Sequence, residues 1–276
     1  MDQYLWKPLR LEEQPQRITE LSLVDDGSGE MWLGLPGEIR RYDHEGRLKR
    51  PSFFLAGRGD VFSIQAEDGT VLAAAADGLY VIDPRQAQVR KVFSGCGGEE
   101  GPCRDMALAG GMLYAADDQG VLYSSDEGRV WHRLKGLGSE APVFKIKPAG
   151  RYAYFLTDHE LYRLELATRQ LDKVFDGGIP HEAVYSVEDE EFVFERKLQA
   201  FDADISGERL AVGGASGIFQ SLDAGEHWQP LSRQGLESGS LKGILLLKNG
   251  LPCHGEGARD GGAIPQGVPP GPTFLA

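Results

Sequence analysis

The chain has 276 residues, of which 41% are hydrophobic and 37 are glycine, a composition typical of a β-rich fold with many turns. Its formal net charge of −13, without any long run of Lys and Arg, argues against binding to nucleic acid or to an anionic lipid surface. The sequence shows neither a membrane span nor a secretory signal, so as written it predicts a cytoplasmic protein, with no membrane span.

A pattern ending in an aliphatic–aromatic pair recurs along the chain at intervals of about 40 residues or more, as in repeat proteins. The pairs end at Tyr80, Tyr123, Tyr162 and Phe219, and a weaker copy precedes them at 37–40. Two short alternating segments precede each pair and one follows it, which gives four strands per repeat. Four-stranded units at this period are typical of the blades of a β-propeller.

The sequence therefore predicts an all-β propeller of four-stranded blades. In chain order the blades are expected at 18–57, 60–94, 103–136, 142–176 and 198–233, and a sixth begins at 241. The expected number is six or seven, and the last blade is either incomplete or closed by the N-terminal strand, because 6–9 and 228–231 share the pattern Trp-x-Pro-Leu. The propeller is expected to span 1–248, followed by a disordered, Gly/Pro-rich tail at 249–276. We interpret this tail as a frameshifted or truncated end.

Two segments depart from the repeat. The loop between the second and third blades holds Cys96 and Cys103, which either form a disulfide, hold a metal together with outside ligands, or stay free thiols. An insertion at 179–196 is either a hairpin that binds a basic protein partner or a solvated hairpin on a blade rim. Its candidate contact residues are the acids and aromatics Glu188, Asp189, Glu190, Glu191, Phe192 and Phe194.

Two segments share the pattern Ser-x-Asp-x-Gly-x-x-Trp at the same place in the repeat. They are formed by Ser124, Asp126, Gly128 and Trp131, and by Ser221, Asp223, Gly225 and Trp228. An Asp side chain in a turn accepts hydrogen bonds from the backbone N–H groups after it, glycine permits positive φ, and Trp offers a large apolar face. We interpret all eight residues as structural rather than catalytic.

The two segments resemble the Asp-box (BNR) repeats of a propeller family that includes sialidases, sortilin-type receptors, some endoglucanases and photosystem II assembly factors. The turns at 43–46 and 83–84 look like degraded copies of the same box. The resemblance implies that the box is a structural turn away from the binding face. Because members of the family are exported, it also leaves an exported location open.

The resemblance to sialidases implies an early Arg-Ile-Pro motif, but the Ile-Pro pairs at 179–180 and 264–265 do not follow arginine. No histidine spacing suggests a metal site and no Gly-rich loop suggests a phosphate site, so no catalytic residue, metal or cofactor is expected. The sequence favours a non-catalytic binding or assembly scaffold for a protein partner. The alternative is a carbohydrate-active propeller, similar to glycoside hydrolases, with a glycan ligand, because 42 acidic residues leave a paired-carboxylate site open.

Overall fold

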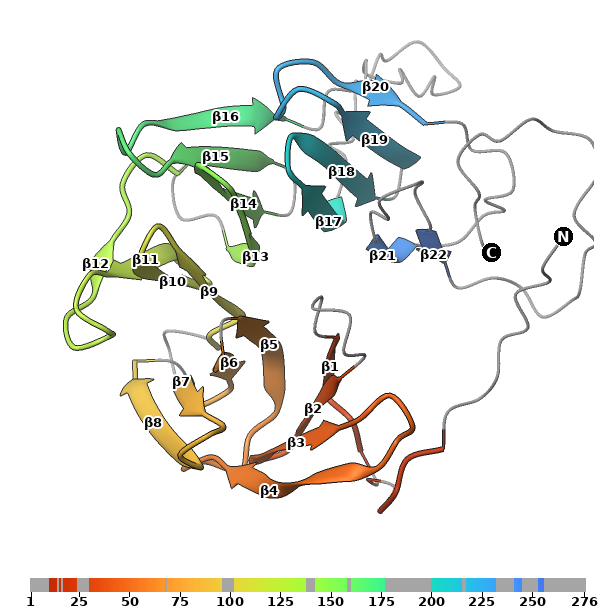
Figure 1. The fold of residues 1–276 in the computed structure, drawn as a ribbon. Helices are drawn as coiled ribbons and strands as arrows, with labels where there is room; N and C mark the ends of the chain where they lie inside the picture. The colour runs from red at the N-terminus through yellow and green to blue at the C-terminus, as the bar shows by residue number, and fades with distance from the viewer. Residues whose placement is uncertain are drawn as a thin grey trace, which may run out of the picture. The chain divides into compact units, whose positions relative to one another are not determined.

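The computed structural model describes residues 10–13, 15, 17–23, 30–67, 69–95, 102–137, 142–157, 160–176, 200–214, 217–231, 241–244 and 253–255 (Figure 1). The regular structure in these ranges consists of β-strands, which confirms the expected all-β class. Within them no helix is long and apolar enough to cross a membrane. The chain divides into two compact units, 1–135 and 136–276, which are described separately.

The first unit contains three four-stranded antiparallel sheets, each with its strands in chain order. The first sheet comprises β1 (Glu20–Leu23), β2 (Met31–Leu35), β3 (Glu38–Tyr42) and β4 (Leu48–Phe54). The second comprises β5 (Val61–Glu67), β6 (Thr70–Ala75), β7 (Gly78–Asp83) and β8 (Gln88–Phe93). The third comprises β9 (Asp105–Ala109), β10 (Met112–Asp117), β11 (Gly120–Ser124) and β12 (His132–Arg133).

The second unit contains two further four-stranded sheets and a two-stranded one. The fourth sheet comprises β13 (Val143–Ala149), β14 (Tyr152–Thr157), β15 (Leu161–Glu165) and β16 (Leu171–Phe175). The fifth comprises β17 (Ala200–Ser206), β18 (Arg209–Gly214), β19 (Gly217–Ser221) and β20 (Gln229–Pro230). The short strands β21 (Leu241–Ile244) and β22 (Cys253–Gly255) pair with each other.

The five four-stranded sheets coincide with the five complete blades expected from the sequence, and β21 begins where the sixth was expected. The segment at 6–9 and the insertion at 179–196 lie outside the described residues, as do all but three residues of the expected tail. The expected blade number, ring closure and boundary at 248 therefore stay predictions.

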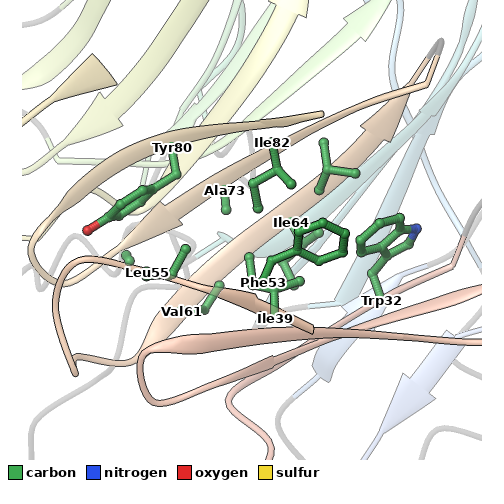
Figure 2. Packing of buried hydrophobic residues seen from close by; sticks show 11 residues of the cluster. Trp32, Ile39, Phe53, Leu55, Val61, Ile64, Ala73, Tyr80 and Ile82 are labelled. Carbon is green, nitrogen blue, oxygen red and sulfur yellow. The ribbon is translucent and has the colours of Figure 1, made fainter. Parts of the chain in front are cut away.

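Small side chains in the second strand of a sheet let its neighbours pack closely on both faces. In β6, Ala73 and Ala75 point into a buried cluster shared with the first sheet, while Leu72 and Ala74 point into a cluster shared with the third. Figure 2 shows the first cluster, in which Trp32, Ile39 and Phe53 from the first sheet meet Val61, Ile64 and Tyr80 from the second. This period-two alternation buries both faces of one short strand, which a sheet cannot do alone.

The pairing register corrects one detail of the repeat. Gly78, Gly120 and Gly217 each begin the third strand of a sheet and pair with the last residue of the second strand. Counting from these glycines, Leu122 and not Tyr123 occupies the position of Tyr80 and Phe219. Leu122 is buried, at 7% exposure, whereas Tyr123 is only half-buried.

Candidate functional site

The first Ser-x-Asp-x-Gly-x-x-Trp segment is a tight turn held by side chains. The Ser124 hydroxyl donates to Asp126 Oδ1 at 2.7 Å and accepts from the Gly128 N–H at 2.9 Å. Asp126 Oδ1 also accepts from the Val130 N–H at 2.9 Å. This last bond is the main cause that holds the pKa of Asp126 below its usual value. The carboxylate is therefore engaged inside its own turn.

The second segment repeats this arrangement. The Ser221 hydroxyl donates to Asp223 Oδ1 at 2.8 Å and accepts from the Gly225 N–H at 2.9 Å. Asp223 accepts from both the backbone N–H and the ring Nδ1 of His227, at 2.9 and 2.7 Å. These bonds, the backbone one first, lower the pKa of Asp223 to about 2.

Each segment delivers its tryptophan to the outermost strand of the preceding sheet. Trp131 Nε1 donates to the Val92 carbonyl of β8 at 3.1 Å, and Trp228 Nε1 donates to the Val174 carbonyl of β16 at 2.7 Å. Val92 and Val174 both lie where the pairing register of the outermost strand shifts. We call these two indole–carbonyl bonds the tryptophan contacts. Each gives a hydrogen-bond partner to a carbonyl on an edge strand.

The tryptophan rings also pack against an aromatic residue of the same edge strand. The ring centroids of Phe93 and Trp131 are 5.6 Å apart, and those of Phe175 and Trp228 are 4.7 Å apart. Both distances lie within the range of favourable aromatic pairs. The tryptophan contact and this ring pair together join β8 to the third sheet and β16 to the fifth.

A group of acid, tyrosine and lysine accompanies each tryptophan contact. In the second sheet, Tyr80 donates to Asp77 at 2.6 Å and Lys91 donates to the same carboxylate at 2.9 Å. The fourth sheet repeats the group, with Tyr162 and Lys173 as donors to Glu160. Burial and then the bond to Asp77 raise the pKa of Tyr80 to about 12, so the phenol stays a hydrogen-bond donor at neutral pH.

In the second unit an open groove of about 340 Å³ lies beside the outermost strand β16. Its walls come from the end of β16, from β19 and from β20. The lining residues are Lys173, Val174, Phe175, Asp176, Phe219, Trp228 and Pro230. Phe219 and Trp228 are half-buried, and Pro230, Lys173 and Asp176 are mainly exposed. This volume falls in the lower part of the range found for ligand pockets.

The third sheet has an ion pair at the positions that Gly214 and Pro230 occupy in the fifth sheet. Pro230 pairs with Phe219, and the register puts Arg133 in the same position beside Leu122. Arg133 makes two bonds, of 2.9 and 2.8 Å, to the carboxylate of Asp117 at the end of β10. The fifth sheet has Gly214 in the place of Asp117, so Gly and Pro replace an ion pair.

Several candidate residues from the sequence lie outside the described part of the chain. These are Cys96 and the acidic and aromatic set Glu188, Asp189, Glu190, Glu191, Phe192 and Phe194. Cys103 is completely buried and is disulfide-bonded, whereas its pairing with Cys96 stays a prediction. In the described ranges no three His, Cys, Asp or Glu side chains come together as a metal site.

The sequence does not predict a site at Phe219 and Pro230. It indicates Phe219 only as the end of a repeated pair and Pro230 only as part of the Trp-x-Pro-Leu pattern. The available signal was the difference between the two Ser-x-Asp-x-Gly-x-x-Trp repeats, in which Arg133 and Pro230 follow the tryptophan at the same distance. That difference acquires meaning only once the partner of Arg133 is known.

No family model matches the chain, and no curated protein resembles it at a significant level. Solved structures do resemble it. The extracellular domain of a putative one-component system from B. thetaiotaomicron is 13% identical over 86% of this chain and 31% of its own, with a TM-score of 0.60. A GH74 xyloglucanase from Xanthomonas campestris is 13% identical over 83% of this chain and 42% of its own, with a TM-score of 0.55.

Virginiamycin B lyase from Staphylococcus aureus, solved as an inactive variant with quinupristin, is 14% identical over 88% of this chain and 80% of its own, with a TM-score of 0.66. These structures are propellers, so the fold of this chain is a β-propeller. The chain spans 31% of the length of the B. thetaiotaomicron protein and 42% of the xyloglucanase. At these identities the likeness concerns the fold alone.

Proposed function

We propose that this chain is a non-catalytic propeller of Asp-box repeats that binds a protein partner. The observation that carries the proposal is the groove beside β16, where Gly214 and Pro230 stand in place of the ion pair of Asp117 and Arg133 in the third sheet. The Ser, Asp and Trp residues that both Asp-box repeats share form hydrogen bonds within the fold. Phe219 and Pro230 differ between the repeats and line an open surface, as residues at a binding site do.

We assign a structural role to the two Asp-box sets. In each set the Asp is engaged by backbone N–H groups of its own turn, and the Trp binds the preceding sheet. The eight box residues therefore support the scaffold rather than form its binding site.

The charge state of the carboxyl groups supports a non-catalytic function. A general acid at neutral pH needs a raised pKa, as in glycosidases. Among the described residues, each carboxyl with a shifted pKa is shifted downward; these are Glu38, Asp43, Asp77, Asp126 and Asp223. Such groups remain ionised acceptors of hydrogen bonds.

A glycan is the second candidate ligand, because half-buried Phe219 and Trp228 in the groove could contact the apolar face of a sugar ring. Hydrolysis of a glycosidic bond uses two carboxyl groups across the bond. Asp176 is the one carboxyl among the seven described residues that line the groove, so we propose that a glycan would be bound there and not cleaved.

The insertion provides a second proposed contact. Its residues Glu188, Asp189, Glu190, Glu191, Phe192 and Phe194 combine acids with aromatics. This part of the proposal rests on the sequence. It predicts a partner with basic and apolar groups on its surface.

The test is a capture experiment with the tagged full chain in the organism that encodes it, followed by mass spectrometry. Three baits are compared with the natural chain: Pro230→Arg, which fills the groove; Gln229→Arg, its matched control on the opposite face of β20; and a deletion of 180–197. Gln229 and Pro230 are both exposed and adjacent, so their side chains point to opposite faces.

We expect one stoichiometric protein with the natural chain and with Gln229→Arg, and its loss with Pro230→Arg. Loss with the deletion as well would support the second contact. Equal recovery of that protein with all baits would contradict the assignment of the groove as its binding site, and no stoichiometric protein at all would contradict the proposed function. Binding to glycan arrays with no protein partner would favour the second candidate.

A further inference from the structure

Two buried N–H donors lie side by side in the first sheet without an acceptor. The register pairs Trp32 of β2 with Arg41 of β3, and the guanidinium carbon of Arg41 lies 5.5 Å from the centre of the Trp32 ring. Trp32 is 3% exposed, and within the described part of the chain neither its Nε1–H nor the Arg41 Nε–H has a hydrogen-bond partner. Figure 2 shows the indole nitrogen on the side of the ring that faces away from the other labelled side chains. We call these two groups the donor pair; buried donors without an acceptor are rare, because leaving them unpaired is costly.

The fourth sheet has donors at the matching positions, and there they are bonded. Tyr154 and Arg163 pair across β14 and β15, at the same distance from the connecting hairpin as the donor pair in the first sheet. The Ala224 carbonyl of the fifth sheet accepts from the Tyr154 hydroxyl at 3.3 Å and from Arg163 at 3.0 Å. Arg163 also donates to the carboxylate of Glu226 at 2.7 Å. A carbonyl oxygen and a carboxylate oxygen are therefore the acceptors that this arrangement takes.

The turn that supplies these acceptors has another form in the second sheet. Ala224 belongs to an Asp-box turn, whereas β7 and β8 stay paired as far as Asp83 and Gln88 and are joined by a plain hairpin. Asp83 accepts from the backbone N–H groups of Arg85 and Gln86, at 2.8 and 3.1 Å, so its carboxylate is bonded within its own turn. The second sheet therefore does not supply the donor pair with the acceptors that the fifth sheet supplies to the fourth.

Arg41 is also a cation without a counter-ion. Its neighbour in the register, Lys49 of β4, is paired with Glu30, and among the described residues no acid forms an ion pair with Arg41. Exposure increases along this row of the sheet, from buried Trp32 to half-buried Arg41 and to Lys49, whose side chain is 41% exposed. An anion can thus approach the donor pair from the side of β4.

We propose that the donor pair binds the carboxylate of a small organic acid. One carboxylate oxygen accepts from the Trp32 Nε1–H and the other from the Arg41 guanidinium, whose planar fork suits a carboxylate. A sulfate or phosphate would bring further oxygens toward Ile39 and Phe53, apolar side chains of the same cluster that offer no donors. Both donor nitrogens are buried, which favours a small free acid over a side chain of another protein. The site lies in the first unit and does not depend on the groove beside β16.

The test follows the indole N–H signals of the full chain labelled with ¹⁵N at its four tryptophans. Trp131 and Trp228 already donate to carbonyls and are internal controls, and Trp32→Phe identifies the Trp32 signal. Acetate and succinate are titrated at neutral pH, with chloride, sulfate and phosphate at matched ionic strength. Arg41→Met removes the guanidinium, and Arg47→Met removes an exposed arginine of the neighbouring turn as the matched control. Unchanged control signals show that a variant is folded, and Arg41→Gln replaces Arg41→Met if that variant is unfolded.

We expect acetate and succinate to move the Trp32 signal downfield and saturably, with binding at least about tenfold weaker in Arg41→Met and unchanged in Arg47→Met. Equal binding to Arg41→Met would exclude the guanidinium from the site and overturn this inference. No shift of the Trp32 signal, an equal response to chloride, sulfate or phosphate, or equal shifts of the Trp131 and Trp228 signals would also overturn it. A shift caused only by a captured protein partner would assign the donor pair to a protein interface in place of a small acid.

Discussion

At the scale of single residues, position 128 requires glycine for two separate reasons. Its φ is +83°, and a Cβ atom there would lie 2.7 Å from the Cβ of Val92 on the edge strand. Gly111 has a similar φ of +74° with nothing within 4 Å of an added Cβ. Comparing Gly128 with Gly111 therefore separates the energetic cost of backbone strain from the cost of the close approach of two sheets.

We predict that Gly128→Ala costs about 2–4 kcal/mol of unfolding free energy, because positive φ and overpacking add. Gly111→Ala, the matched control, should cost only the backbone part, about 1–2 kcal/mol. Urea unfolding of the two variants measures both values. Equal losses would show that β8 yields to the extra methyl group and that contact between the sheets does not require the glycine.

The Asp223 carboxylate predicts a defined pH dependence. Its pKa in the folded chain is lowered to about 2, from an unfolded value of about 3.9. A lowered pKa stabilises the fold above the unfolded value, and the stabilisation is lost as pH falls from about 4 to about 2.

Accordingly, the difference in urea midpoint between the natural chain and Asp223→Asn should be constant near neutral pH and should shrink between about pH 4 and pH 2. Midpoints recorded across that range at constant ionic strength make the comparison. A difference that stays constant down to pH 2 would mean that the bonds to His227 and Ser221 do not favour the ionised form.

At the scale of strands and sheets, the two tryptophan contacts are equivalent but lie in different units. Trp131→Phe removes the N–H donor to Val92 and keeps an aromatic ring, so it should cost about 1–3 kcal/mol through the unpaired carbonyl. Hydrogen exchange should then accelerate in β8 and leave β16 unchanged. Trp228→Phe should do the reverse, which makes each variant the control for the other. Equal acceleration in both strands after either change would contradict the local role of the contacts.

The strands and the Asp-box turns could be predicted from the sequence because their determinants are local. Alternation sets each strand, and Ser124 and Gly128 lie within one turn of Asp126. The groove could not be predicted, because it is lined by residues of β16 and by residues of β19 and β20 that lie more than 40 residues away in the sequence. The register shift at Val92 also depends on a partner strand, β7. The equivalence of Leu122, rather than Tyr123, with Tyr80 likewise follows only from the pairing of β10 with β11.

At the scale of the whole molecule, the chain keeps a propeller fold at 13–14% identity to propellers that include a xyloglucanase and a lyase. Period-two alternation and small residues such as Ala73 to Ala75 are enough for neighbouring sheets to pack, so few identities are needed. Function must then be sought in positions that depart from the repeat, such as Phe219 and Pro230.

The most direct test of this account is a hydrogen-exchange footprint of the full chain with and without its captured partner. The account predicts slower exchange on binding in β16 and in β19 to β20, with no change in the matching strands β8, β11 and β12. Protection confined to the strands of the first unit, or no protection at β16, would contradict the assignment of the groove as the binding site.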